Sequence, residues 1–363
     1  MTAREAGPLA GLRVLEVATH YAAPQIGAML GDLGADVVKI ETSSGDPMRR
    51  SGVIRDGVAR GWQWIGRNKR SVVLDLETDD DAATLQQLVG VADVLVENLD
   101  DKTRSRWHCT YEELAAGNER LVVVRVSCYG TNGPYAGRPG AGTLAEAFAG
   151  LSHMTGDPNG PPVLSSVPLG DTVTAFWGVI GALAACWGRD ARDRTGRLVD
   201  IAMYEPVLQV LAGTIAAYDV GGESPKRTGS GVPGGAPRNV YRTGDGEWIA
   251  VSGTTDQQVA RLLPLIGHDT ADDRERFGTS AHRLETGEAL DALVATWVAS
   301  RDREEAVQAL LDARIPVAPV NDIPALLADP HAIARGDIER IRNARAPELG
   351  AHRAEVLSEW LRQ

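Results

Sequence analysis

The chain has 363 residues, 43% of them hydrophobic, which is enough material for a buried core and for more than one domain. Its formal net charge of −12 excludes general nucleic-acid binding, because contacts with phosphates need a basic surface. The first seven residues carry charges and no run of eighteen apolar residues occurs, so we expect no signal peptide, no membrane span and a cytoplasmic location.

The first half of the chain alternates apolar runs with amphipathic stretches, a pattern typical of βα units around a parallel sheet. The turn after the first apolar run reads ATHYAAPQ and lacks the GxGxxG pattern with which a backbone approaches a pyrophosphate, so an NAD enzyme is disfavoured. We predict strands at 12–17, 36–40, 71–76, 92–97 and 121–127, and helices at 22–33, 80–91 and 111–118.

A basic segment lies inside this half. Between Arg49 and Arg70 the chain has seven basic residues and one acid, Asp56. This concentration suits a small polyanionic ligand, but it is equally typical of a solvated loop whose arginines pair with carboxylates. Trp62 and Trp64 suit stacking on a purine or burial in the core. The residues leave both interpretations open.

The middle of the chain is rich in Gly and Pro. We predict loops at 129–142 and 150–170, followed by a long apolar helix at 172–187, a strand at 199–201 and a helix at 204–218. A further Gly- and Pro-rich segment at 221–237 is predicted to be a linker or a mobile loop.

The remaining third has a different pattern. We predict a hairpin of strands 239–243 and 248–252, then helices at 256–266, 287–300 and 303–313. Residues 316–320 are predicted to form a strand that returns to the first domain. The expected organisation is therefore a discontinuous large domain at 1–200 and 314–363, a linker helix at 201–220 and a small α+β domain at 221–313.

Asp171 stands directly before the long apolar helix. An aspartate there is favoured as an N-cap, which accepts a hydrogen bond from a backbone N–H of the first turn. A helix N-terminus also keeps a carboxylate ionised beside donors that stabilise an oxyanion. From the local sequence, capping is the stronger interpretation, and both roles are compatible.

Motifs spread along the chain in a fixed order resemble those of the family III CoA-transferases, the CaiB/BaiF superfamily. They include GLRVLEV at 11–17, GDLGADVVKIE at 31–41, NKRS at 68–71, YGTNGP at 129–134, VPLGD at 167–171 and PVAPVN at 316–321. The resemblance covers nearly the whole chain. It implies an α/β fold in which a Rossmann-like large domain and a small domain form an interlocked homodimer.

The resemblance also implies an activity, the transfer of CoA from an acyl-CoA to a carboxylic acid. Asp171 occupies the position of the family's nucleophile, which passes through a mixed anhydride and an aspartyl-CoA thioester. The glycine-rich residues 229–235 resemble the family's mobile loop, which shields the anhydride from water. No metal is implied, because the three cysteines and seven histidines lack ligand spacing.

Positions that match the family's contacts with CoA are carried over one at a time. They are His20, Tyr21, Leu74, Asn98, Leu99, Arg106 and Met203. Lys69 and Arg70 are added to the predicted CoA site for their charge.

Two departures from the family pattern affect the prediction. Residues 99–102 read LDDK where members commonly have FRPG, and Ala141 and Gly142 stand where many members have an aromatic residue and an acid. Racemases on this fold place a histidine at the Ala141 position and a glutamate near Arg242, so racemisation or isomerisation of an acyl-CoA is the weaker alternative. The other alternative is a non-catalytic, CoA-binding subunit of a heteromeric transferase.

Overall fold

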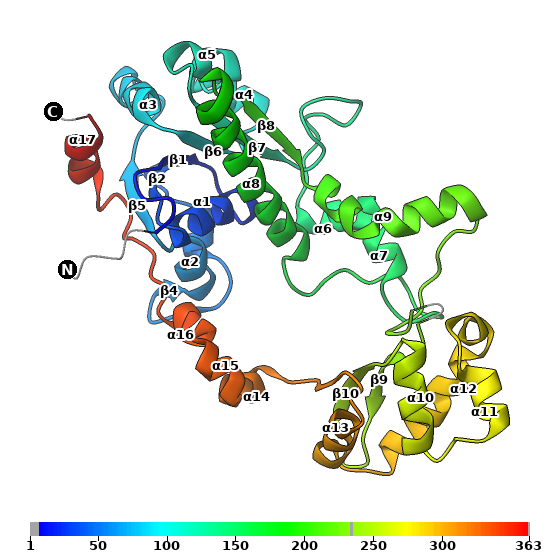
Figure 1. Ribbon diagram of the computed structural model, residues 1–363. Coiled ribbons are helices and arrows are strands. Elements are labelled where there is room, and N and C mark those ends of the chain that lie inside the picture. Colours follow the sequence, from blue (N-terminus) through cyan, green and yellow to red (C-terminus); the bar gives the residue numbers. More distant parts are fainter. Residues whose placement is uncertain (1–6, 233–234, 362–363) are drawn as a thin grey trace. The chain divides into compact units, whose positions relative to one another are not determined.

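The computed structural model describes residues 7–232 and 235–361, and these divide into two compact units (Figure 1). The first unit contains residues 7–152, 164–223 and 339–361, and the second contains 153–163 and 224–338. The chain therefore passes from one unit to the other after residues 152, 163, 223 and 338.

A sheet of six parallel strands forms the centre of the first unit, which confirms the predicted α/β class (Figure 1). The strands consist largely of Val, Leu and Ile buried on both faces, the condition for an all-parallel sheet. Their order reverses between β1 and β6, and such a reversal opens the crevice where α/β sheets bind ligands. From edge to edge the strands are β5 (Lys69–Val73), β2 (Asp36–Glu41), β1 (Arg13–Val17), β6 (Val94–Glu97), β7 (Val122–Ser127) and β8 (Leu198–Ala202).

Helices cover both faces of this sheet. On one face the apolar cluster includes residues of α1 (Ala22–Asp32) and α8 (Leu169–Gly188). On the other face it includes residues of α3 (Asp79–Val91), α5 (Tyr111–Gly117) and α17 (Arg353–Leu361). Because α17 comes from the C-terminal end of the chain, the first unit is built from separate stretches of the sequence.

Shorter elements lie in segments for which no helix or strand was predicted above. Each is too short to show a readable helical or strand period. They are η1 (Pro47–Arg50), β3 (Ile54–Arg55), β4 (Val58–Ala59), α2 (Arg60–Ile65), α4 (Asp101–Arg106), α6 (Gly142–Ala149), α7 (Leu151–Met154) and η2 (Arg189–Asp193). The predicted helix after β8 is present as α9 (Tyr204–Gly221).

The second unit is built on an antiparallel sheet of β9 (Arg238–Arg242), β10 (Trp248–Ser252) and β11 (Val317–Pro319). The predicted return of residues 316–320 to the first domain is wrong, because β11 pairs with β10. Arg314–Ile338 consequently belong to the second unit. Its helices are α10 (Asp256–Leu265), α11 (Ala271–Phe277), α12 (Ser280–Ala299), α13 (Arg303–Asp312), α14 (Ile323–Ala328) and α15 (Pro330–Arg335), with α16 (Asp337–Arg342) following.

A buried cluster of charges joins three strands of the large sheet. The carboxylate of Glu16 on β1 lies 2.9 Å from Lys39 Nζ of β2 and 2.7 Å from Lys69 Nζ of β5. Lys39 also pairs with Asp46 at 2.9 Å, and all four side chains are fully buried. Burial lowers the pKa of Lys69 to about 8, an effect that Glu16 only partly offsets. The cluster ties β1, β2 and β5 together, through residues near the carboxyl ends of β1 and β2 and at the start of β5.

Removing the shared carboxylate tests this cluster. We expect Glu16→Gln to lower the free energy of unfolding by about 3–5 kcal/mol, because two buried ammonium groups lose their common partner. Urea denaturation followed by circular dichroism measures the change. Asp56→Asn removes the acid of an exposed pair with Arg60 and should leave the unfolding free energy nearly unchanged. Equal losses in the two variants would contradict the expectation.

Candidate functional site

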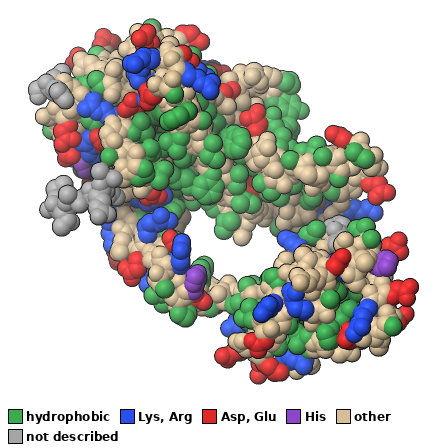
Figure 2. Space-filling view, in the orientation of Figure 1, with side chains coloured by type: hydrophobic (Ala, Val, Ile, Leu, Met, Phe, Trp, Pro, Cys, Tyr) green, Lys and Arg blue, Asp and Glu red, His purple; other side chains and the backbone are tan. Residues whose placement is uncertain are grey.

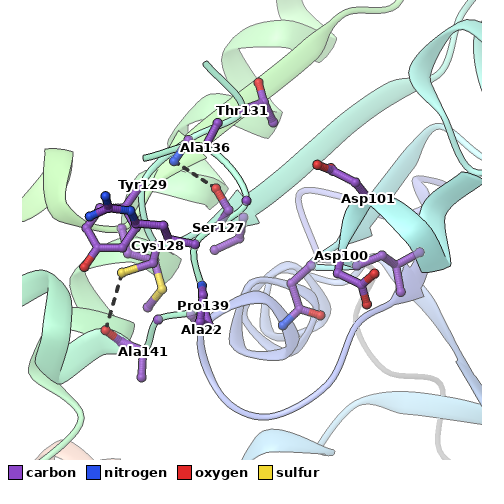
Figure 3. Close-up of a pocket in the computed structure, with 18 of the residues that line it drawn as sticks. Ala22, Asp100, Asp101, Ser127, Cys128, Tyr129, Thr131, Ala136, Pro139 and Ala141 are labelled. Carbon is purple, nitrogen blue, oxygen red and sulfur yellow. Dashed lines mark hydrogen bonds between the residues drawn. The ribbon is translucent and has the colours of Figure 1, made fainter. Parts of the chain in front are cut away.

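A cavity of about 670 Å³ opens at the carboxyl edge of the large sheet. It is lined by the loops after β1, β6 and β7, by Met203 after β8, and by Asp171 at the start of α8. Figure 3 shows Cys128 and Ala141 on one side of the cavity and Asp100 and Asp101 on the other. The cavity thus lies beside the reversal of strand order between β1 and β6, where this fold class binds ligands.

Two of the lining loops are fastened together at this reversal. Asn98, after β6, accepts a hydrogen bond from the Thr19 amide at 3.0 Å and donates one to the Thr19 carbonyl at 2.9 Å. His20, which follows Thr19, has a left-handed φ of 69°, and its amide donates a hydrogen bond to Asp46 at 3.3 Å. Such a backbone conformation is unfavourable for a residue other than glycine and persists only where its surroundings fix it. The buried charge cluster therefore reaches the cavity through Asp46.

Asp171 is the third residue of α8, which begins at Leu169 rather than at the predicted Thr172. The N-cap is Pro168, and it provides no side-chain hydrogen bond. The interpretation of Asp171 as the N-cap is therefore wrong, because the Asp171 main chain is already helical. Its carboxylate sits in the first turn, where the helix dipole favours a negative charge.

Gly142, the first residue of α6, makes room for this carboxylate. A Cβ atom at Gly142 would lie 2.1 Å from Asp171 Oδ2, much closer than two unbonded atoms can approach. The absence of a side chain at position 142, a departure from the family pattern, is thus required by the position of Asp171. The carboxylate lies between the N-terminal ends of two helices.

The electrostatic surroundings of Asp171 favour its neutral form relative to water. Burial raises the pKa of the Asp171 carboxyl and the charge of Glu146 adds to the rise, whereas its own amide and His20 oppose it. Burial and the charge of Asp171 also raise the pKa of Tyr21, and burial raises that of Cys128. At neutral pH the phenol and the thiol beside Asp171 are therefore uncharged.

The structure brings most of the predicted site residues together. His20, Tyr21, Asn98, Leu99, Asp171 and Met203 all line the large cavity. Leu99 also borders a second, smaller cavity of about 80 Å³, and Leu74 lines that one. Leu74 itself is fully buried in the core.

Lys69, Arg70 and Arg106 line neither cavity. Lys69 is part of the buried charge cluster. The Arg70 guanidinium pairs with Asp36 at 2.5 Å and with Glu355 and Glu359 of α17. Arg106 is exposed and pairs with Glu77 at 3.2 Å. In this structure their charges are matched by carboxylates of the same unit.

Two further arginines of the basic segment follow the same pattern. Arg49 pairs with Glu41 at 2.6 Å, and Arg67 pairs with Asp32 at 2.5 Å. Both tryptophans lie under these arginines, since the Arg49 guanidinium is 4.2 Å from the Trp62 ring and that of Arg67 is 3.6 Å from the Trp64 ring. Between the two interpretations of this segment, the contacts favour pairing with carboxylates.

Two basic residues of the cavity were missed by the sequence analysis. Lys102 and Arg138 line it, and neither forms an ion pair with any described residue. The Arg138 guanidinium stacks 3.7 Å from the Tyr135 ring. Their positions offered a signal, because each follows the carboxyl end of a predicted strand, where loops of a parallel sheet converge. A third basic residue of the lining, Arg104, pairs with Glu97 and Asp101.

The cavity lining combines the half-buried Asp171 carboxylate with the exposed carboxylates of Asp100 and Asp101. Within residues 7–232 and 235–361, no group of three His, Cys, Asp or Glu side chains is placed to hold a metal ion. Cys109, Cys128 and Cys186 are buried and free. The glycine-rich residues 229–235 belong to the second unit, and positions 233–234 lie outside the described residues.

Comparison with known proteins assigns the family. The model of CoA-transferase family III matches residues 9–358. The chain belongs to this family. The resemblance recognised in the sequence is confirmed, and so is the activity class, a CoA-transferase.

Individual relatives agree with this assignment. The alpha subunit of succinyl-CoA–L-malate CoA-transferase of Chloroflexus aurantiacus is 36% identical over 93% of this chain and 79% of its own length. Succinyl-CoA–D-citramalate CoA-transferase of the same organism is 36% identical over 94% and 85%. A crystal structure of a CaiB/BaiF family protein from Brucella suis is 30% identical, covers 98% of this chain and 100% of its own, and has a TM-score of 0.85.

The space at position 142 yields a prediction for this CoA-transferase. Gly142→Ala should lower kcat about 100-fold with little change in KM, because the new methyl group displaces the Asp171 carboxylate by roughly 1 Å. CoA transfer from succinyl-CoA to a panel of carboxylic acids measures both constants. Gly90→Ala in α3, where nothing lies within 4 Å of the added Cβ, should keep full activity. Retained activity in Gly142→Ala would contradict the prediction.

Proposed function

We propose that this CoA-transferase moves CoA between carboxylic acids through covalent intermediates on Asp171. The observation that carries the proposal is the half-buried Asp171 carboxylate at the end of a cavity large enough for the thioester end of an acyl-CoA. A carboxylate is a weak nucleophile, and it becomes effective through proximity and partial removal from water rather than through a general base.

The proposed steps balance without a further reactant. An oxygen of Asp171 attacks the thioester carbonyl, the carbon–sulfur bond breaks, and CoA leaves as a thiolate from a mixed anhydride. The thiolate then attacks the Asp171 carbonyl carbon, which releases the donor acid and leaves an aspartyl-CoA thioester. The acceptor carboxylate repeats the two steps in reverse and leaves with CoA. The first turns of α6 and α8 supply N–H groups near Asp171, and we propose that those still free stabilise the oxyanion.

The cavity offers contacts for CoA. We propose that Lys102 and Arg138 meet its phosphates, because they are the lining cations without a carboxylate partner among the described residues. His20, Tyr21, Asn98, Leu99 and Met203 would line the path of the pantetheine arm, and Leu74 would border the smaller cavity. For Lys69, Arg70 and Arg106 a contact with CoA requires that their present carboxylate partners be exchanged.

The relatives suggest a donor. Two of them are named for succinyl-CoA, so we propose a dicarboxylic acyl-CoA such as succinyl-CoA as the first donor to test. We keep the cytoplasm as the proposed location.

An adduct experiment tests the nucleophile. Incubated with succinyl-CoA alone, the wild-type protein should gain the mass of one CoA thioester, and peptide mapping should locate it at Asp171. Asp171→Asn and Asp171→Ala should both lose the adduct and turnover. Because Asp171 is not the N-cap, each should cost less than about 1 kcal/mol of stability, the range of a helix-dipole interaction.

Other results would point to other functions. An adduct elsewhere, or no adduct with any acyl-CoA donor, contradicts the proposal. Exchange of the α-proton with deuterated water in the absence of an acceptor would favour the racemase alternative. Binding of CoA without adduct formation would favour a non-catalytic subunit, and one relative is itself named as an alpha subunit.

The surface of the first unit supports a homodimer. Large apolar side chains are exposed on two adjacent helices, and Figure 2 shows apolar side chains gathered over this unit. They are Phe176, Trp177, Ile180 and Trp187 of α8 and Val210, Ile215 and Tyr218 of α9. By length and composition alone Leu169–Asp193 could also cross a membrane, but one face of α8 forms part of the core. We propose that a second copy of the chain covers the exposed residues.

The mass in solution tests the dimer. Light scattering should give twice the chain mass of 38.6 kDa for the wild type. Ile180→Glu, which puts a charge into the exposed apolar surface of α8, should shift the protein toward monomer. Asp80→Lys at an exposed position of α3, which lies on the other face of the sheet from α8, changes charge without this effect. A monomeric wild type would contradict the homodimer.

A further inference from the structure

Glu146 of α6 is a charged residue with no place in the sequence predictions or in the lining of the cavity. Its side chain is almost completely buried. One carboxylate oxygen accepts a hydrogen bond from the Gly170 amide at 2.8 Å, and the other accepts one from the Ser165 hydroxyl at 2.6 Å. Burial of a carboxylate costs free energy unless hydrogen bonds or an opposite charge compensate the loss of water.

The bond to Gly170 replaces a missing cap. The first N–H groups of a helix have no partner within the helix, and an N-cap side chain normally supplies one. The N-cap of α8 is Pro168, whose ring provides no acceptor. Glu146 therefore gives the helix that contains Asp171 its acceptor from a neighbouring helix.

The first turns of α6 and α8 are in close contact at Gly142 and Gly170. A Cβ atom at Gly170 would lie 2.6 Å from the Gly142 carbonyl oxygen and 3.2 Å from Glu146 Cγ. The residue before Asp171 is thus held between Glu146 and Gly142, and the Asp171 carboxylate lies in the space at Gly142. A shift of the Glu146 side chain would therefore displace the main chain at Gly170, the residue next to Asp171.

We infer that Glu146 is the positioning residue of Asp171: it fixes the start of α8 and places a second negative charge beside the nucleophile. This inference rests on the proposed role of Asp171. An amide at position 146 would keep the two hydrogen bonds, since its oxygen accepts from Gly170 and its nitrogen donates to Ser165. The two hydrogen bonds alone therefore do not require a charge at position 146.

That second effect concerns proton affinity. Within the described residues, the titratable and charged groups that act on Asp171 are Glu146 from α6, His20 from the turn after β1, Tyr21 at the start of α1 and Cys128 after β7. Burial raises the pKa of Asp171 and Glu146 raises it further. A more basic carboxylate is a stronger nucleophile once ionised, so removing the charge should lower both basicity and reactivity.

Two variants separate position from charge. Glu146→Gln keeps the hydrogen bonds and removes the charge, so the acidic limb of the kcat profile should move to lower pH while KM stays unchanged. Glu146→Asp keeps the charge but is too short to reach both partners, so kcat should fall about 10- to 100-fold through misplacement of Asp171, without that displacement of the limb. Transfer from succinyl-CoA across pH 4–9 gives the profiles, and thermal melting shows that each variant is folded.

Glu113→Gln is the matched control. The Glu113 carboxylate also bonds an amide and a hydroxyl at a helix start, both from Thr110, but it belongs to α5, away from the cavity. Its profile should coincide with that of the wild type. If Glu146→Gln leaves the acidic limb in place, or Glu146→Asp keeps full kcat, the inference is wrong. Absence of the wild-type adduct at Asp171 would instead remove the proposed function itself.

Discussion

The carboxylate of Glu16, shared by two buried lysines, is the constraint on which the large unit depends. It joins β1 to β2 and β5, and Lys39 donates a further bond of 2.6 Å to the Ala18 carbonyl in the turn that leads to His20. Asp46 extends the cluster to the His20 amide. The edge of the sheet that forms the cavity is therefore set by charges that never meet solvent, and ligand charges have to be met by other residues.

Much of the large unit could be predicted from the sequence, because strands buried on both faces are runs of Val, Leu and Ile that no other element resembles. The pairing of residues 316–320 was missed because the sequence of a short apolar strand does not indicate which sheet it joins. The start of α8 was predicted too late because Pro168 and Gly170 were taken as signs of a loop. The structure has Pro168 as the N-cap and Gly170 in the first turn.

The candidate site was predictable where it depends on strand ends and not where it depends on pairing partners. His20 and Asn98 follow strands that meet at the reversal of the sheet order, so topology brings them together. Lys69 and Arg70 bind carboxylates that lie up to 289 positions away in the sequence, and no local pattern reveals such partners. Lys102 was interpreted as a departure from a motif, although it is a cation of the cavity without an ion pair in the part of the chain that the structure describes.

The path of the chain between the two units has a consequence for how such a protein can change over time. Residues 153–163 belong to the second unit, yet they run from within α7 to the segment that leads to α8. A gene segment covering 224–338 would therefore carry only part of the second unit. A single recombination event cannot replace that unit whole without also replacing the chain that leads into the helix of Asp171. Exchanging residues 153–338 in one piece would therefore also exchange Asp171.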